Sequence, residues 1–135
     1  IMDDIFVARL MSTDPKTVTP DMLVEQAAKL MIDSDVGSVL VVEDDNQLAG
    51  ILTRTDFVHI VAGQKPKDQT PILAYMSDTP VTISAQASVA DAADLMVESG
   101  VHHLPVVDDD AGLIGIVTTT DLAAHIAGLD RSVPA

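Results

Sequence analysis

The chain has 135 residues, no cysteine, and seven basic against 21 acidic residues, which gives a formal net charge of −14. This length suits one domain or two half-size lobes that share a core, and the lack of cysteine excludes disulfides and thiolate sites. A chain this acidic should be repelled by nucleic acids and by anionic membranes. Neither is therefore expected as a partner.

Hydrophobic residues make up 47% of the sequence and aromatic residues only 2%, so aliphatic side chains must form the core. No apolar run approaches the roughly 18 residues of a membrane span. The N-terminus carries Asp3 and Asp4 rather than the basic start of a signal peptide, which favours the cytoplasm. The acidic excess resembles proteins of salt-loving organisms, whose medium screens self-repulsion; an ordinary acidic protein is the alternative.

An internal repeat organises the chain. Residues 11–63 align without a gap on residues 76–128, and 23 of these 53 positions are identical. The repeat predicts two lobes related by a pseudo-twofold axis, each burying an apolar face that it could not bury alone. We place the division at residues 1–69, a first repeat with its lead-in helix and linker, and residues 70–135, a second repeat. The linker-like stretch is residues 62–70.

The predicted elements of each repeat follow the order β-α-β-β-α. A short amphipathic segment leads in, and a short extended piece follows it. Apolar residues at i, i+3, i+4 and i+7 then predict a long helix from Val24 in one copy and from Val89 in the other. Ser88 with Asp91 is an N-cap signature, and Gly100 is a typical helix end, for which the first copy has the weaker Asp35. The lead-in and extended segments are Ile5–Met11 with Lys16–Thr19, and Pro71–Met76 with Val81–Ser84.

Two strands follow in each copy as near-continuous apolar runs, which is typical of strands covered on both faces. They are Ser38–Val42 with Leu48–Leu52, and His103–Val107 with Leu113–Val117. The acidic turns between them are interpreted as solvated hairpin tips rather than metal sites, because turns favour Asp, Asn and Gly. The last helices are expected to start near Asp56 and Asp121.

The most informative stretch is Gly50-Ile-Leu-Thr-Arg-Thr-Asp56, which returns as Gly115-Ile-Val-Thr-Thr-Thr-Asp121. Each is predicted to be a strand running into a helix. Thr53 and Thr118 stand at the N-cap with an Asp three residues later, close to a capping box. A strand that leads into a helix N-terminus can also bind an anion. The stretch therefore has two interpretations, a capped helix or a nucleotide site.

The Gly-h-h-Thr-x-x-Asp stretches (h, apolar), Met-Ser…Pro at residues 11–15 and 76–80, and Val101-His-His-Leu-Pro-Val106 together resemble the tandem CBS domain, or Bateman module. The resemblance covers nearly the whole chain. It implies an α/β (α+β) fold in which two β-α-β-β-α repeats form one compact module, a regulatory role, and homodimerisation. It also implies that AMP, ADP, ATP or S-adenosylmethionine binds in one or both inter-repeat clefts as a regulatory ligand, with no cofactor required.

The resemblance also implies the site residues. Asp56 and Asp121 would hold the ribose hydroxyls, as a carboxylate can accept from both hydroxyls of a cis-diol. Ribose or phosphate would meet Thr53, Arg54, Thr55, Thr118 and Thr120. The cleft walls would be formed by Thr17, Thr19, Gly37, Ser38, Thr82, Ser84, His102 and His103.

The two clefts should differ. Arg54 gives the Asp56 cleft a local cation, whereas residues 76–128 contain no Lys or Arg; Arg54 could equally be a solvent-facing helix residue. Neighbouring strand residues point to opposite faces, so His102 and His103 cannot both face one site. His59 and His125 are isolated and are interpreted as structural.

The sequence shows no catalytic triad, P-loop, zinc-ligand spacing or paired catalytic carboxylates, so an enzyme is not expected. The leading hypothesis is a non-catalytic, adenine-nucleotide-sensing module that acts on itself or on a regulated protein that the sequence does not name. The alternative is a structural or dimerisation module of the same fold with vestigial clefts.

Overall fold

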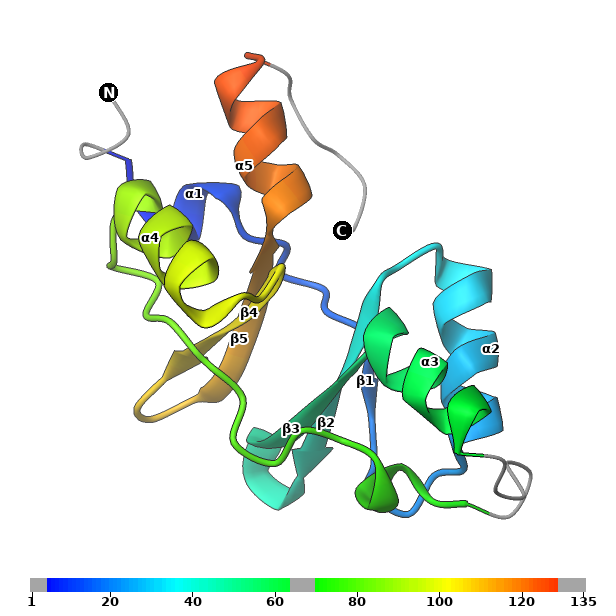
Figure 1. Cartoon of the computed structure of the whole chain (residues 1–135). Helices are drawn as coiled ribbons and strands as arrows, with labels where there is room; N and C mark the ends of the chain where they lie inside the picture. The colour runs from blue at the N-terminus through cyan, green and yellow to red at the C-terminus, as the bar shows by residue number, and fades with distance from the viewer. Residues whose placement is uncertain (1–4, 64–69, 129–135) are drawn as a thin grey trace. The chain divides into compact units, whose positions relative to one another are not determined.

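The computed structural model describes residues 5–63 and 70–128. Asp3, Asp4 and most of the predicted linker at residues 62–70 lie outside these ranges. The chain forms two compact units, which are described separately: unit 2 is Lys16–Pro80, and unit 1 combines Ile1–Pro15 with Val81–Ala135. Figure 1 labels their helices and strands.

Unit 2 is a three-stranded sheet with helices. Strand β2 lies in the middle, parallel to β1 and antiparallel to β3. In chain order the elements are β1 (Thr17–Val18), α2 (Val24–Ser34), β2 (Ser38–Glu43), the 3₁₀ turn η2 (Asp44–Asn46), β3 (Gln47–Thr53), α3 (Arg54–Ala62) and the 3₁₀ turn η4 (Ile72–Ala74).

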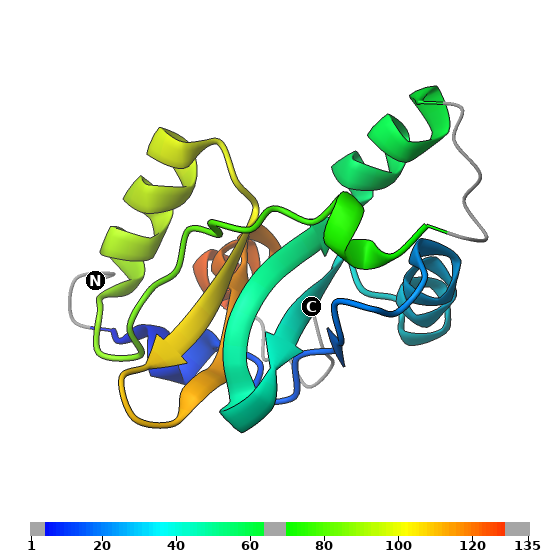
Figure 2. The ribbon, with the colours of Figure 1, turned by 90° about the horizontal axis from the view of Figure 1, so that it is seen from below.

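Unit 1 repeats this plan around an antiparallel hairpin, which can be followed in Figures 1 and 2. Its first strand is reduced to one parallel bridge between Ile83 and Val106, which matches the pairing of Val18 with Val41 in β1 and β2. The predicted β-α-β-β-α order is confirmed in both copies. The named elements are α1 (Val7–Leu10), α4 (Val89–Ser99), β4 (His103–Asp108), β5 (Gly112–Thr118) and α5 (Thr119–Ile126).

The long helices begin and end at the predicted residues. The Ser88 hydroxyl accepts a hydrogen bond of 2.9 Å from the Asp91 N–H at the start of α4. Gly100 ends this helix in the left-handed region, with φ of 66°. Asp35 ends α2 in the same conformation, with φ of 54°, although a side chain there is strained.

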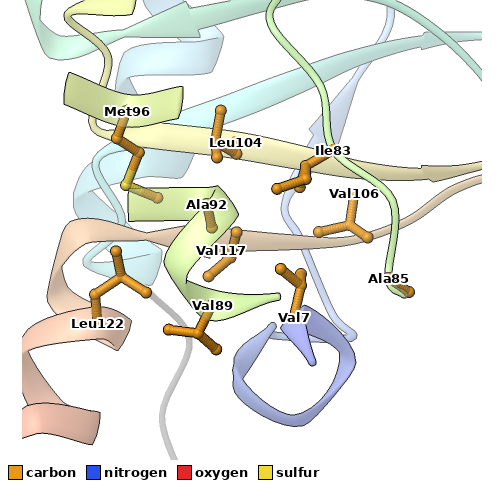
Figure 3. Close-up of a cluster of buried hydrophobic side chains, with 10 residues drawn as sticks. All are labelled: Val7, Ile83, Ala85, Val89, Ala92, Met96, Leu104, Val106, Val117 and Leu122. Atoms are coloured by element: carbon orange, nitrogen blue, oxygen red, sulfur yellow. The ribbon is translucent and has the colours of Figure 1, made fainter. Parts of the chain in front are cut away.

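The core of unit 1 lies between α1, α4 and one face of the hairpin (Figure 3). The face follows from strand alternation: Leu104, Val106 and Val117 point to the same side. Val7 from α1 points into the same cluster as Val89 and is fully buried. Unit 2 has the corresponding core, in which Val39, Val41 and Leu52 of the sheet pack with Val24, Ala27 and Met31 of α2.

Each lead-in segment docks on the other repeat. In unit 1 the N–H of Val7 donates to the Ala87 carbonyl at 2.8 Å, and Ser12 and Ile116 exchange two backbone hydrogen bonds. In unit 2 the N–H of Ile72 donates to the Met22 carbonyl at 2.8 Å, and Ser77 and Ile51 exchange two backbone bonds in the same way. The compact units therefore divide the chain differently from the sequence repeats at residues 1–69 and 70–135.

The docked lead-in segments explain one glycine in each repeat. A Cβ atom at Gly50 would lie 2.6 Å from the Ser77 carbonyl oxygen, and one at Gly115 would lie 2.7 Å from the Ser12 carbonyl oxygen. Each of these oxygens accepts a backbone hydrogen bond from the last strand of its unit, so moving it would break that bond. Glycine is thus needed where the lead-in segment crosses the last strand.

Candidate functional site

Asp56 and its threonine form the predicted capping box at the start of α3. The Asp56 Oδ2 atom accepts from the Thr53 N–H at 2.7 Å and lies 3.3 Å from the Thr53 hydroxyl. Thr53 is the last residue of β3, so the strand delivers it directly to the helix start. The side chain of Asp56 is partly buried.

The second copy has the same arrangement at the start of α5, but deeper. Asp121 Oδ2 accepts from the Thr118 N–H at 2.8 Å and from the Thr118 hydroxyl at 3.1 Å. The Asp121 N–H in turn points to the Thr118 hydroxyl at 3.4 Å. Thr118 and Asp121 are both buried, whereas Thr53 and Asp56 are only partly buried. The Thr-x-x-Asp spacing is the same in both copies, so it does not predict this difference.

Capping occupies much of the N-terminal donor set of both helices. Besides the N–H groups taken by the two carboxylates, the Arg54 N–H donates to the Gly37 carbonyl at 3.3 Å and the Thr119 N–H donates to the His102 carbonyl at 3.0 Å. An anion at either helix start would therefore meet fewer backbone donors than a bare N-terminus provides. The contacts would depend more on side chains.

Several predicted residues of unit 2 share one face of its sheet. Ser38 is the direct partner of Thr53, and Leu40 pairs with Thr17 on β1. Because Val39, Val41 and Leu52 point to the helix-covered side, alternation places Ser38, Thr53 and Thr17 on the opposite face. This group with Asp56 and Arg54 is called the Asp56 site below.

In unit 1, His103 is the partner of Thr118 and stands where Ser38 stands in unit 2. Ile83, Leu104 and Val117 point into the core of unit 1. Because neighbouring strand residues point to opposite faces, Thr82, His103 and Thr118 lie on the face away from α4. His102 precedes β4 and is exposed. Thr82, His103, Thr118 and Asp121 are called the Asp121 site.

Other predicted residues have local roles or point into solvent. The Thr19 hydroxyl donates to the Asp21 carboxylate at 2.7 Å, and the Ser84 hydroxyl bonds the Gln86 side chain at 3.0 Å and its N–H at 3.2 Å. Both are turn contacts two residues along the chain. Exposed side chains are those of Arg54, Thr55, Thr120 and His59, and His125 is partly exposed.

The acidic hairpin tips are exposed turns, as predicted. In the second tip the Asp108 carboxylate accepts from the N–H of Ala111 at 2.9 Å and of Asp110 at 3.0 Å. These two bonds, of which the bond from Ala111 has the larger effect, hold the pKa of the Asp108 carboxyl below its ordinary value of 3.8.

Within residues 5–63 and 70–128, no three or more His, Cys, Asp or Glu side chains are arranged so that they could hold a metal ion. None of the described helices is both long and apolar enough to cross a bilayer.

Comparison with known proteins gives consistent results. The model of the CBS domain matches residues 7–63 and again residues 72–128. The CBS domain-containing protein YhcV of Bacillus subtilis is 36% identical over 115 residues, which are 85% of this chain and 81% of YhcV.

Solved structures agree. An uncharacterised conserved protein from Pyrococcus horikoshii has a TM-score of 0.86 at 25% identity, covering 100% of this chain and 99% of that one. The CBS domain pair of protein MJ0100, solved in complex with 5′-methylthioadenosine and S-adenosyl-L-methionine, has a TM-score of 0.83 at 26% identity, covering 90% of this chain and 98% of that one. Two matched segments on one repeated fold show that the chain belongs to the CBS domain family, as a tandem pair.

Proposed function

We propose that this chain is a non-catalytic regulatory module that binds adenosine-containing ligands, either adenine nucleotides or S-adenosylmethionine, at the Asp56 and Asp121 sites. The observation that carries the proposal is the repeated carboxylate, held at a strand-to-helix junction beside a threonine hydroxyl. The similarity to a CBS pair that binds two adenosyl compounds supports it.

The geometry suits a ribose. Asp56 bonds Thr53 through Oδ2, and its Oδ1 atom makes no hydrogen bond with any residue that the structure describes. A carboxylate oxygen presented in this way can accept from a ribose hydroxyl, and charge-assisted bonds of this kind are roughly twice as strong as neutral ones. The Thr53 hydroxyl can turn from Oδ2 to the ligand when the second ribose hydroxyl needs an acceptor.

The two sites should prefer different ligands. Unit 2 has five basic and ten acidic residues, whereas unit 1 has two basic and 11 acidic. Arg54 belongs to the Asp56 site, and its counterpart Thr119 in the second repeat carries no charge. A phosphorylated ligand is therefore favoured at the Asp56 site, and the Asp121 site should discriminate less between phosphorylated and uncharged adenosine compounds.

One observation favours a second candidate function, a dimerisation module with vestigial clefts. Large apolar side chains are exposed at equivalent helix positions of both repeats, namely Ile32 and Val97, and Val61 and Ile126. Exposed apolar residues that gather into one contiguous patch are typical of interaction sites. A dimerisation function requires no ligand.

Ligand-induced stabilisation separates the two functions. We would record melting temperatures with AMP, ADP, ATP, S-adenosylmethionine and 5′-methylthioadenosine, and follow each hit by calorimetry. A ligand that binds only the folded state stabilises it by RT ln(1 + [L]/Kd). Asp56→Asn should weaken binding at one site and Asp121→Asn at the other, each by about tenfold or more in Kd, because a charge-assisted bond is lost.

Asp91→Asn is the matched control. Asp91 also stands three residues after an N-cap, and its carboxylate lies 3.4 Å from the Ser88 N–H, but it belongs to neither site. It should reproduce any loss of stability from weakened capping without changing affinity. A parent protein that binds none of these ligands would reject the sensing function in favour of the dimerisation module.

A further inference from the structure

Two methionines pack in equivalent ways against glycines of the last strands. A Cβ atom at Gly50 would lie 2.8 Å from the sulfur of Met76, and one at Gly115 would lie 2.9 Å from the sulfur of Met11. The thioether of each lead-in segment thus occupies the space over a glycine, with no room for a methyl group between them. Met11 and Met76 stand at equivalent positions of the repeat, and each contact lies within one unit.

Both methionines border a core without being enclosed by it. Met11 packs against the core of unit 1 and Met76 against the core of unit 2, and both side chains are partly exposed. Met31 and Met96 belong to these cores and are only 6% and 3% exposed; Figure 3 shows Met96 among its neighbours. A small solute can therefore reach Met11 and Met76 more readily than Met31 and Met96.

The composition makes the thioethers the sulfur chemistry of this chain. It contains six methionines and no cysteine. Peroxides oxidise methionine to the sulfoxide, which turns a flexible apolar side chain into a polar one, and reductases return it to the thioether. An oxidant that meets this protein can thus act on sulfur only at methionine.

We propose that Met11 and Met76 are a pair of reversible oxidation sites, at which a peroxide converts the thioether to the sulfoxide and so weakens the docking of the lead-in segments. An S–O bond forms as the O–O bond of the peroxide breaks. The sulfur is oxidised by two electrons, and hydrogen peroxide is reduced to water. The inference goes beyond the proposed function and does not depend on ligand binding.

The sulfoxide cannot keep the packing of the thioether. A polar oxygen on this sulfur would either lie against glycine backbone and apolar side chains or displace the segment that carries it. The residue after each methionine is the serine that exchanges two backbone hydrogen bonds with the last strand, Ser12 with Ile116 and Ser77 with Ile51. Displacement of the methionine should therefore weaken these bonds.

The test exposes the full chain to dilute hydrogen peroxide at fixed high salt, without ligand. Peptide mapping by mass spectrometry should find oxygen added at Met11 and Met76 before Met31 and Met96. The melting temperature should then fall by about 3–6 °C. Treatment with methionine sulfoxide reductases should restore it.

Hydrogen exchange locates the change. In the oxidised protein the N–H groups of Ile51 and Ile116 should exchange with solvent at least about tenfold faster, because their acceptors lie on the lead-in segments. The N–H groups of Val36 and Val101, which donate to the carbonyls of Met31 and Met96, should change less. This measurement needs no substitution.

The matched variant combines Met11→Leu with Met76→Leu. Leucine is apolar, has a similar volume and resists peroxide, so this protein should keep its melting temperature and its amide exchange during the treatment. Met2 and Met22 remain in the variant, so any residual loss belongs to them.

Three results would overturn the inference. Met31 and Met96 could be oxidised as fast as Met11 and Met76, the oxidised parent could keep the amide exchange of Ile51 and Ile116, or the leucine variant could lose as much stability in peroxide as the parent does. None of these results bears on the proposed function, since no ligand is present.

Discussion

The carboxylates of Asp56 and Asp121 have two roles, one in capping a helix and one proposed in binding the ligand. Each accepts the N–H of its own threonine and so holds a helix start in place, a contact worth about 1 kcal/mol in typical helices. The same carboxylate is the proposed partner of a ribose. Truncation to alanine removes both contacts, which is why the asparagine variants, which retain an acceptor for the cap, report more cleanly on binding.

Arg54 provides a prediction on electrostatics. The side chain is exposed and begins α3 one residue after Thr53. Arg54→Ala should weaken binding of AMP and ATP more than binding of adenosine, because the lost attraction acts on the phosphate. The effect should shrink as salt rises, since exposed charges are screened. Calorimetry at low and high salt measures it.

Thr119→Ala, at the equivalent position of α5, is the control and should leave the preference for phosphate unchanged. Equal losses for AMP and adenosine in Arg54→Ala would show that the guanidinium does not contact a phosphate.

Helices α2 and α4 end in the same backbone conformation although a different residue stands at each end, Asp35 after α2 and Gly100 after α4. Both helices have 11 residues and both stop at a left-handed residue. Gly100 adopts this conformation without strain, whereas Asp35 holds a Cβ there. The buried helix faces, Val24, Ala27 and Met31 against Val89, Ala92 and Met96, fix where each helix must end. Packing therefore overrides the weaker stop signal.

Two separate variants, one at Asp35 and one at Gly100, should change the free energy of unfolding in opposite directions. Asp35→Gly should raise the free energy of unfolding by about 0.5–1 kcal/mol, and Gly100→Asp should lower it by a similar amount, because the left-handed region disfavours a side chain. Urea unfolding at fixed high salt gives both values.

Asp33→Gly controls for the loss of one negative charge from a chain of net charge −14. Asp33 lies inside α2, so glycine there should be destabilising by about 1 kcal/mol. A stabilisation of equal size in both variants would assign the effect to charge instead of conformation.

At the scale of the whole molecule, the two units are built by exchange of their lead-in segments. Residues around α1 complete unit 1, and residues around η4 complete unit 2, through equivalent backbone bonds. Truncation of the chain at the sequence-repeat boundary would therefore remove part of a core, because Val7 and Ile72 are both fully buried.

The exposed apolar residues lead to a prediction about assembly. We expect a homodimer in which helices of both repeats meet, so light scattering at high salt should give about twice the mass of the chain. High salt is needed because chains of charge −14 repel each other. Ile32→Asp and Val97→Asp, at sites 78% and 82% exposed, should shift the population to monomer.

Gln86→Glu, a change of one charge at an exposed position outside these helices, should leave the mass unchanged. A parent protein that is monomeric at micromolar concentration in high salt would contradict the prediction.

The sequence by itself determined the repeat, the order of elements and the helix caps, since these depend on local spacing. Periodicity located α2 and α4, the apolar runs located both hairpins, and Thr and Asp three residues apart specified the capping boxes at Thr53 and Thr118. These are contacts between residues close in the chain, so their signals are local.

Only the tertiary structure decided which residues lie together across the repeats and which polar groups are paired. The docking of Ile5–Met11 on the second repeat is a long-range packing choice, and a short amphipathic segment carries no signal for its partner. The same is true of the two capping boxes: Thr118 and Asp121 are buried whereas Thr53 and Asp56 are partly buried, and this difference depends on neighbours far along the chain, which local spacing does not encode.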